Sequence, residues 1–539
     1  MKTSSAFCLV LLLPIAASAQ GRYDQFTAKF QKTADQAKVE AATFLGGAGT
    51  EWLVGGGFQP DGTVVVAGVA LGPRLDLPGV KEVVLGTDAP APSPPTPKPQ
   101  TDKNGKVVVD KQGNPKLEPF NWRHENATAF VVRLSADLKS IQSVSRFPWK
   151  SCGVTSACVD GQGNIYLAGP ATEGVKHLPN VEAMPTTDAA AKGALTTFTY
   201  VAKLEPDAAR IAWIKTFQGG SSSPTVRVMN DGKIRFTGPD VRTFDSAGRL
   251  EKSIVVPGGL IGHVAVNPVD GTHVRAGEHH WPTGREPYRD PLLNIHRPDG
   301  KLQLELYNWD GPFVGLDNLR LVSDSAVRAV RYDSNGDLLI YAWSDGGNSV
   351  MYREPFDIRT FSKKMDGLGM SAYGAGVLSC AYLIRIDTKT YKVSGGMLWL
   401  AYLKHNNKPN SIWINALESV GDGSLAFAGH SAYGLIQTGN AIGDSEPTGA
   451  YVALVNRGCD SLRFCSTMPG CGRVDVAEGQ RWGIVGGSQK GRPKVLFLGG
   501  AVESEDVNGQ NRDAPRIPPT QPRFGGGHSD GYILMLDLS

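Results

Sequence analysis

The chain has 539 residues, of which 55 are lysine or arginine and 52 are aspartate or glutamate, so its formal net charge at pH 7 is only +3. This near balance gives no reason to expect nucleic acid or an anionic membrane surface as a partner. Glycine (65 residues) and proline (35 residues) separate many short β-branched runs, which favours strands and turns over helices.

The chain begins with the pattern of a secretory signal. Lys2 is followed by an apolar run at residues 6–15 and by a small-residue cleavage site at residues 17–19. The run is too short to span a membrane, and no later stretch reaches the roughly 20 apolar residues that a spanning helix needs. We therefore expect a signal peptide at residues 1–19 and a protein that is secreted, periplasmic or held at the cell surface, with a single-span anchor as the alternative.

The cysteines allow disulfides but do not specify them. Six remain after the predicted cleavage: Cys152, Cys158, Cys380, Cys459, Cys465 and Cys471. Six cysteines in an exported chain permit 15 complete pairings. One local disulfide is expected within the group formed by the last three, whereas the first two could bond only if residues 153–157 turn back. The chain contains no C-x-x-C-H motif for c-type haem, and we predict no cofactor.

After a lead segment at residues 20–38, one motif recurs seven times. Turn residues come first and period-two apolar positions follow, as in DGTVVVAG, which is typical of a β-hairpin. The copies begin at Asp61, Gln162, Asp231, Asp270, Asn335, Asp422 and Pro493. An alternating strand, A, precedes each copy, which is itself strand B. A strand C follows, and a further apolar run, strand D, completes most units.

Seven units of four strands predict an all-β fold, a seven-bladed β-propeller over residues 39–539. The last unit ends at its strand C, while residues 39–45 form a strand that has no unit before it. We therefore expect this N-terminal strand to close the last blade. A pair of β-sandwiches is the alternative, but it would leave both irregular ends unexplained.

The first two units resemble a known family. The stretch TFLGGAGTEWLVGGGFQPDGTVVVAG at residues 43–68, and GQGNIYLAG in the second unit, are similar to the T-(Y/F)-L-G-G … D-x-x-G-N-x-Y-V-x-G pattern. That pattern marks bacterial secreted seven-bladed β-propeller repeat proteins (SBBP-like repeats). Later units depart from it in length and in the Leu-Gly-Gly element. The resemblance implies a secreted propeller, and because the family carries no single activity, it implies no functional residue.

Extra length is concentrated between strands B and C. Only the third unit lacks an insertion there, and the others have theirs at residues 69–128, 170–197, 278–291, 343–379, 430–449 and 500–529. All B–C connections leave the same end of a blade, so we expect one elaborated face that binds a polysaccharide or a protein. Random drift in loop length is the alternative, and it would scatter insertions over both faces. The first insertion contains a Pro-rich segment, 86–119, with an extended polyproline stretch.

The fourth unit is the richest in chemically active side chains. It contains five of the ten histidines, and it carries His273 and Arg275 where other copies are apolar. The residues that follow offer Glu278, His279, His280, Trp281, Arg285, Tyr288 and Arg289. His263 on the preceding strand could lie near His273 or Arg275 across the hairpin.

Three interpretations of this unit remain open. In the first, a one-residue slip points Val274 inward and leaves His273 and Arg275 in solvent. In the second, a ligand-binding rim uses His273, Arg275, Trp281, Arg285 and Arg289. Trp281 and Tyr288 stack on sugars, and Arg285 or Arg289 pairs with carboxylates. In the third, His279, His280 and Tyr288 catalyse proton abstraction beside a uronic carboxylate, or Glu278 and the histidines hold a metal.

No motif identifies a reaction. The histidine spacing fits no zinc signature, so we predict no metal. Residues 333–337 begin like a calcium loop, but the position that needs glutamate is Ser344, and a hairpin turn explains them better. The sequence thus predicts a monomeric, non-enzymatic binding or scaffold module without a membrane span. The alternative is a carbohydrate-active enzyme, similar to a polysaccharide lyase, that uses the fourth unit.

Overall fold

The computed structural model describes residues 37–539 with gaps at 48, 73, 76, 78, 88–100, 109–126, 186–197, 219–222, 239, 256–261, 281–287, 309–323, 346–348, 366–377, 404–407, 444–448, 469, 472–481, 502–514, 518–520, 522–524 and 526–528. The predicted signal peptide, almost all of the lead segment and much of the Pro-rich segment lie outside the described residues.

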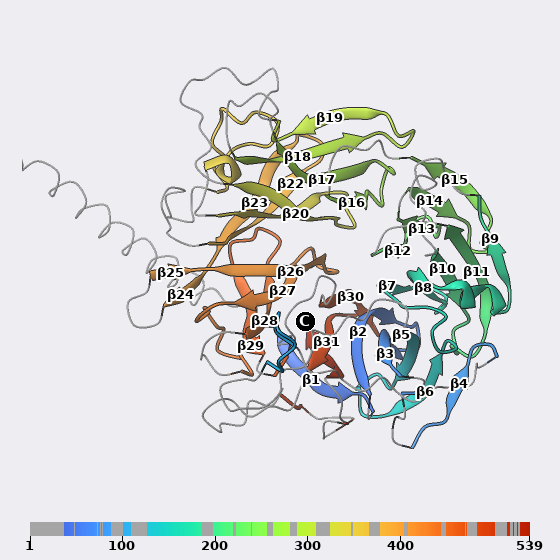
Figure 1. The fold of residues 1–539 in the computed structure, drawn as a ribbon. Helices are drawn as coiled ribbons and strands as arrows, with labels where there is room; N and C mark the ends of the chain where they lie inside the picture. Colours follow the sequence, from blue (N-terminus) through green and yellow to red (C-terminus); the bar gives the residue numbers. More distant parts are fainter. Residues whose placement is uncertain are drawn as a thin grey trace, which may run out of the picture. The chain divides into compact units, whose positions relative to one another are not determined.

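The described residues form a β-propeller of seven four-stranded blades, which confirms the predicted fold class (Figure 1). The chain divides into two compact units. Blades 4, 5 and 6 belong to the unit that contains Pro257–Met468, and blades 1, 2, 3 and 7 to the unit of Lys38–Val256 and Pro469–Ser539. No helix in the described part of the chain is long and apolar enough to cross a membrane.

In the first of these units, each blade is one antiparallel sheet in the order A, B, C, D. Blade 4 contains β16 (Gly262–Val266), β17 (His273–His280), β18 (Arg289–His296) and β19 (Leu302–Leu306). Blade 5 contains β20 (Ser325–Tyr332), β21 (Leu338–Ser344), β22 (Cys380–Asp387) and β23 (Lys392–Trp399), with the 3-10 helix η2 (Ser349–Tyr352) in its B–C insertion. Blade 6 contains β26 (Ile412–Ser419), β27 (Leu425–Ser431), β28 (Gly449–Val455) and β29 (Leu462–Met468). A hairpin of β24 (Ala401–Leu403) and β25 (Lys408–Asn410) connects blades 5 and 6.

The other unit repeats this plan. Blade 1 contains β2 (Thr50–Phe58), β3 (Val64–Leu71), β5 (Ala127–Leu134) and β6 (Ile141–Arg146), with β4 (Glu82–Val84) added outside β6. Blade 2 contains β7 (Ser156–Val159), β8 (Ile165–Ala171), β10 (Phe198–Leu204) and β11 (Ile211–Gln218), with η1 (Glu173–His177) and β9 (Val181–Ala183) in its insertion. Blade 3 contains β12 (Thr225–Val228), β13 (Ile234–Thr237), β14 (Val241–Phe244) and β15 (Leu250–Ile254). Blade 7 contains β30 (Gly483–Gln489), β31 (Arg492–Ala501), β32 (Asp530–Asp537) and β1 (Lys38–Leu45).

The N-terminal strand closes the last blade, as predicted. β1 pairs antiparallel with β32 and so takes the place of the missing strand D, which brings the first strand of the chain next to the last (Figure 1). Phe44 of β1 is fully buried and packs edge-on against Tyr532, with ring centroids 5.9 Å apart. The buried Lys494 pairs with Asp537 at 2.8 Å and with Glu40 at 2.5 Å. Apolar contact and ion pairing therefore both hold this seam.

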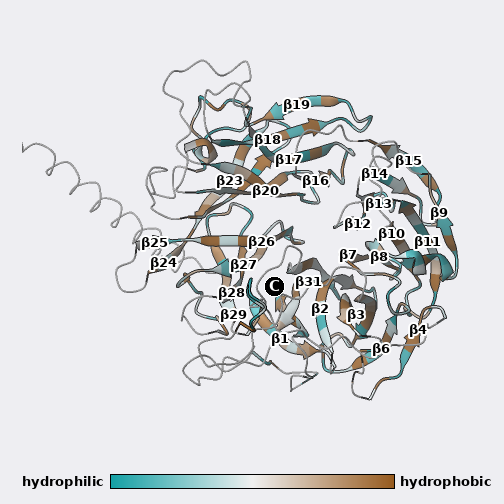
Figure 2. Ribbon diagram, viewed as in Figure 1, coloured by the Kyte–Doolittle hydropathy of each residue, from teal (hydrophilic) through white to brown (hydrophobic). Residues whose placement is uncertain are grey.

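The A–B hairpins form because their turns satisfy their own backbone. In blade 1, Gln59 N–H donates to the carbonyl of Thr63, and the Asp61 carboxylate accepts from the N–H of Thr63. Gly62 has φ +92°, a conformation that costs glycine little. Strands β3 and β5 of this blade are then mostly apolar, and brown is prominent along β3 in Figure 2.

Side-chain donors join neighbouring blades at these turns. In three cases, a side chain of one blade donates to the carbonyl of the A–B turn glycine and to a C–D turn carbonyl of the next blade. The sets are Gln489 with Gly62 and Ala136, Gln59 with Gly163 and Pro206, and Arg385 with Gly423 and Arg457. The bonds to the three glycine carbonyls are buried, so these contacts help to fix how adjacent blades dock.

The B–C insertions differ from the expectation that they only elaborate one face. Several run along the outer edge of their own blade. β4 and β9 pair in parallel with strand D of blades 1 and 2, and residues 517 and 521 bridge to β1 in blade 7. In blade 6, Thr438 donates to the carbonyl of Cys465, and in blade 5 the Glu354 carboxylate accepts from Val393 N–H. These described parts of the insertions therefore cover strand edges, which promote aggregation when they are exposed.

The six cysteines are all free, so the disulfide expected among the last three does not form. Five of them are buried. Burial raises the pKa of the Cys380 thiol to about 12 and that of Cys459 to about 11, because the thiolate is poorly solvated there. These side chains act as small apolar core residues rather than as reactive groups.

Candidate functional site

The histidines of blade 4 do not converge. His273 and His280 are the first and last residues of β17, so their Cα atoms are about 23 Å apart at 3.3 Å per residue. His263 lies opposite Ala276 in the ladder. The described residues include only the backbone of His263, His279 and His280, and neither Trp281 nor Arg285. A single site that uses both ends of β17 is therefore excluded.

His273 is buried rather than solvated. It stacks on His296 of β18, with ring centroids 5.1 Å apart and ring planes 5° from parallel. His296 Nδ1 donates to the carbonyl of Gly300 at 3.2 Å, and burial lowers the pKa of His296. Val274 points into the blade 4–5 core, as the slip interpretation predicted, but that interpretation was wrong in placing His273 in solvent. The two rings replace an apolar cross-strand pair found in the other blades.

Arg275 lies on the same side of β17 as His273, because it is two residues further along the strand. It is half-buried and faces Asn294 across the ladder. Burial lowers the pKa of Arg275, since the protein replaces water around the guanidinium. His273 and Arg275 thus belong to one polar face of the blade 4 sheet, while Val274 and Ala276 form its apolar face.

At the other end of β17, two acids and two arginines form a cluster between blades 4 and 5, which we call the acid–arginine cluster. Arg289 bonds to Glu278 at 3.1 Å and to Asp324 at 3.0 Å. Arg328 of β20 contacts Glu278 at 3.3 Å and lies 5.0 Å from the centre of the Trp343 ring. Arg289 donates hydrogen bonds to the Glu278 and Asp324 carboxylates, and these bonds raise its pKa. Arg289, predicted to bind a ligand carboxylate, thus already binds two carboxylates of its own protein.

Tyr288 comes just before Arg289 and is half-buried, with its ring against the core of blades 4 and 5. The ladder places the backbone of His280 opposite Arg289 and that of His279 opposite Asp290. The predicted catalytic residues therefore lie on neighbouring strands at the B–C end of blade 4. The described residues include no group of three or more histidine, cysteine or acidic side chains arranged to hold a metal.

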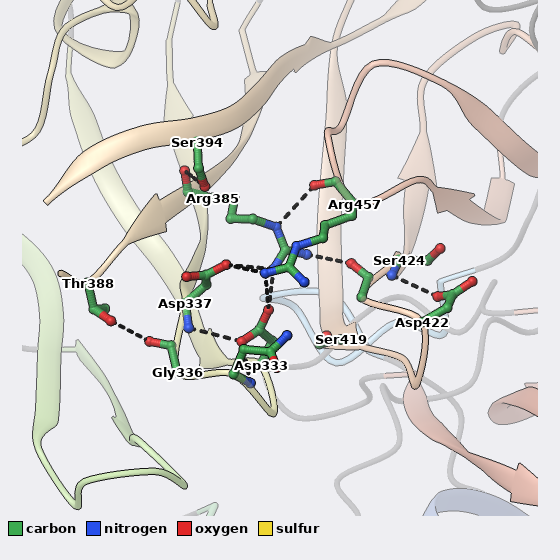
Figure 3. A network of polar contacts seen from close by, with 12 residues as sticks. Asp333, Gly336, Asp337, Arg385, Thr388, Ser394, Ser419, Asp422, Ser424 and Arg457 are labelled. Atoms are coloured by element: carbon green, nitrogen blue, oxygen red, sulfur yellow. Dashed lines mark hydrogen bonds and ion pairs between the residues drawn. The ribbon is translucent and has the colours of Figure 1, made fainter. Parts of the chain in front are cut away.

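The calcium-like stretch at residues 333–337 is an A–B turn whose charges are neutralised within the protein (Figure 3). Asp333 Oδ1 accepts from the N–H groups of Asn335 and Asp337, as in an Asx turn. Asp333 also pairs with Arg385, and both side chains are 1% exposed. Arg457 pairs with Asp337 at 2.7 Å. Two arginines thus occupy the positions that a cation would need, and the hairpin interpretation is confirmed.

The B–C end of blades 5 and 6 also carries an apolar patch around Ser411, which was not predicted from the sequence. We call it the Ser411 patch. Leu378 is 79% exposed and Tyr433 is 42% exposed. Leu378 N–H donates to Ser411 Oγ, and Ala432 N–H donates to the carbonyl of Ser411, so the two apolar residues flank this serine.

Tyr402 of β24 extends the Ser411 patch. Its N–H donates to the carbonyl of Gly434 and its hydroxyl donates to the carbonyl of Leu435, which lays its half-buried ring beside Gly434. Ser431 Oγ accepts from Tyr433 N–H, and this local turn directs Tyr433 away from the core. Leu378, Tyr402 and Tyr433 thus come from three separate connections of the chain. Of the three, only the Ser-Ala-Tyr-Gly turn at residues 431–434 has a local sequence pattern that could have indicated an exposed aromatic residue.

Comparisons with known proteins do not assign this chain to a family. No family model matches the chain, and no curated protein matches it. One similar solved structure is a protein of unknown function from Dyadobacter fermentans, at 10% identity and a TM-score of 0.36, covering 94% of this chain and 99% of that one. Another is the Dos1 propeller, at 8% identity and a TM-score of 0.37, covering 93% and 96%. The assignment as a seven-bladed propeller rests on the strand order of this chain itself.

Proposed function

We propose that this protein is an exported, non-enzymatic binding module whose ligand is a polypeptide that docks at the B–C end of blades 5 and 6. The observation that carries the proposal is the Ser411 patch. Exposed apolar side chains that gather from separate loops are typical of protein-binding surfaces. The signal-like N-terminus and the resemblance of the first two blades to secreted propeller repeats support export.

Several polar residues of blade 4 that were predicted to bind a ligand instead make contacts within the protein. The buried His273–His296 stack and the neutralised acid–arginine cluster leave these groups committed to the fold. A general base must reach its substrate with a lone pair available. Arg328 over Trp343 in blade 5 instead offers a partly exposed surface that suits recognition.

The test is capture of extracellular or periplasmic proteins from the source cell by the purified chain. Leu378→Asp and Tyr433→Asp should each remove the captured partner, which is then purified and its affinity measured by calorimetry. Val269→Asp is the matched control, because Val269 is also exposed but lies in the A–B turn at the other end of blade 4. Equal capture by all four proteins would refute the proposed surface.

A carbohydrate-active enzyme is the second candidate, favoured by the ladder that places His280 opposite Arg289 beside Tyr288. Incubation with acidic and neutral polysaccharides tests it. Turnover that disappears in His279→Ala and His280→Ala would establish the enzyme and displace the binding module. Binding without turnover would exclude the enzyme and would make the ligand a glycan.

A further inference from the structure

The lead segment that precedes β1 is anchored in blade 6. Ala37, the residue just before β1, is buried, and its N–H donates to the carbonyl of Arg463 in β29. Its own carbonyl accepts from Nδ2 of Asn440, which belongs to the B–C insertion of blade 6. The lead segment therefore joins the described part of the chain on blade 6, in the unit that also holds the Ser411 patch.

The sequence of the lead segment carries an aromatic stripe. Tyr23, Phe26 and Phe30 have the spacing i, i+3 and i+7, which places all three on one face of a helix. Ala34 and Ala37 continue this spacing towards the anchor, and the positions between the three aromatic residues are mostly polar. This amphipathic pattern predicts a helix, and a helix this short is stable only when its apolar face packs against another surface.

The reach of the aromatic stripe matches the position of the Ser411 patch. Asn440, which binds Ala37, and Tyr433 of the patch belong to the same insertion and are seven residues apart, so they lie at most about 25 Å from each other. As a helix, residues 23–37 span about 21 Å. The far end of the stripe can therefore reach the patch while Ala37 keeps its contacts in blade 6.

The chemistry of the stripe and of the patch also agrees. Leu378 and Tyr433 of the patch are 79% and 42% exposed, and the side chains of Ser411 and Ser431 beside them carry no charge. Aromatic rings pack favourably on such a surface, whereas a charged segment would lose its solvation there. Attachment to the same chain also gives the stripe a high effective concentration at the patch.

We propose that the lead segment covers the Ser411 patch of its own chain and controls access to it. A partner must then displace the aromatic stripe before it can bind. This inference rests on the proposed function, because it assigns a regulator to the same surface.

Limited digestion of the purified mature chain with trypsin, followed by mass spectrometry, tests the proposal. Trypsin cuts after Lys29 and Lys32 only while the lead segment is released, so the cleavage rate reports the released fraction. We expect this rate to be at least about tenfold higher in Leu378→Asp and in Tyr433→Asp than in the wild type. Val269→Asp is the matched control, because Val269 is also exposed but lies in the A–B turn of blade 4, and it should leave the rate unchanged.

The double variant F26S/F30S tests the other side of the contact. It removes two rings of the stripe and should raise the cleavage rate as much as Leu378→Asp does. Combined with Leu378→Asp, it should give no further increase, because both changes break the same contact. Circular dichroism of each variant shows whether the propeller is folded.

Equal cleavage rates in the wild type, Leu378→Asp and F26S/F30S would overturn the proposal, because the patch would then not hold the lead segment. The proposed function fails in a different way. Faster cleavage in Leu378→Asp, with no protein captured by F26S/F30S, would confirm the contact and refute the partner. Equal cleavage rates with capture lost in Leu378→Asp would do the reverse.

Discussion

Arg385 is a buried cation that serves two blades at once, and its removal should be one of the costliest single changes in the chain. It pairs with Asp333 in its own blade and donates to the carbonyls of Gly423 and Arg457 in blade 6. Arg385→Met keeps the volume of the side chain but leaves a buried carboxylate without its partner. Breaking a buried ion pair in this way costs about 3–5 kcal/mol of unfolding free energy.

Arg133 provides the matched control because it occupies the same place in blade 1. It faces the second residue of strand B, as Arg385 does, but its Nε donates to the neutral amide oxygen of Gln59 at 3.2 Å, and it is half-exposed. A hydrogen bond that involves a charged group contributes about 1.5–3 kcal/mol, and solvent screens this half-exposed one, so Arg133→Met should cost no more than about 1.5 kcal/mol.

Equilibrium urea unfolding at pH 7, followed by circular dichroism, measures both variants. Asp333→Asn preserves the turn, since its amide oxygen can still accept the two N–H groups. The double variant R385M/D333N should therefore lose less than the sum of the single losses, by roughly 0.5–3 kcal/mol. Equal costs for Arg385→Met and Arg133→Met, or strict additivity in the double variant, would show that burial of the ion pair does not govern the stability of this junction.

Three further changes test the seam and blade 4. Phe44→Ala should cost about 3–5 kcal/mol in urea unfolding and should increase hydrogen exchange of β1, whereas slow exchange in β1 would contradict its closing role. Lys494→Met should cost about 3–5 kcal/mol of unfolding free energy at pH 7. Because pairing lowers the pKa of Asp537, that cost should shrink as pH falls below 3.8. A cost independent of pH would refute the ion-pair explanation. Burial lowers the pKa of His296 below 6.5, so the unfolded chain binds more protons and stability falls as pH drops below 6.5. His296→Leu should flatten this loss between pH 7 and pH 5 in thermal melts, and an unchanged slope would assign the pH dependence to other groups.

Local sequence patterns determined most of the architecture. Each A–B hairpin can be predicted from the residues of its turn, as in the Asp61–Gly62 turn of blade 1, because turn geometry depends on only a few adjacent residues. Counting strands was enough to predict that residues 39–45 complete blade 7, and β1 does pair with β32. Period and turn chemistry therefore establish the number of blades and the closure.

The tertiary structure decided where the unusual side chains lie. Whether His273 is solvated or buried depends on what faces it, and it is buried against His296, which comes from another strand. The same holds for Arg289, whose charge is neutralised by two acids from blades 4 and 5. It also holds for Leu378, because Leu378 and Ala432, the residue before Tyr433, both donate hydrogen bonds to Ser411. These contacts depend on the docking of blades and on the path of long insertions. No local period encodes that path, so the sequence by itself could indicate the residues but not their surroundings.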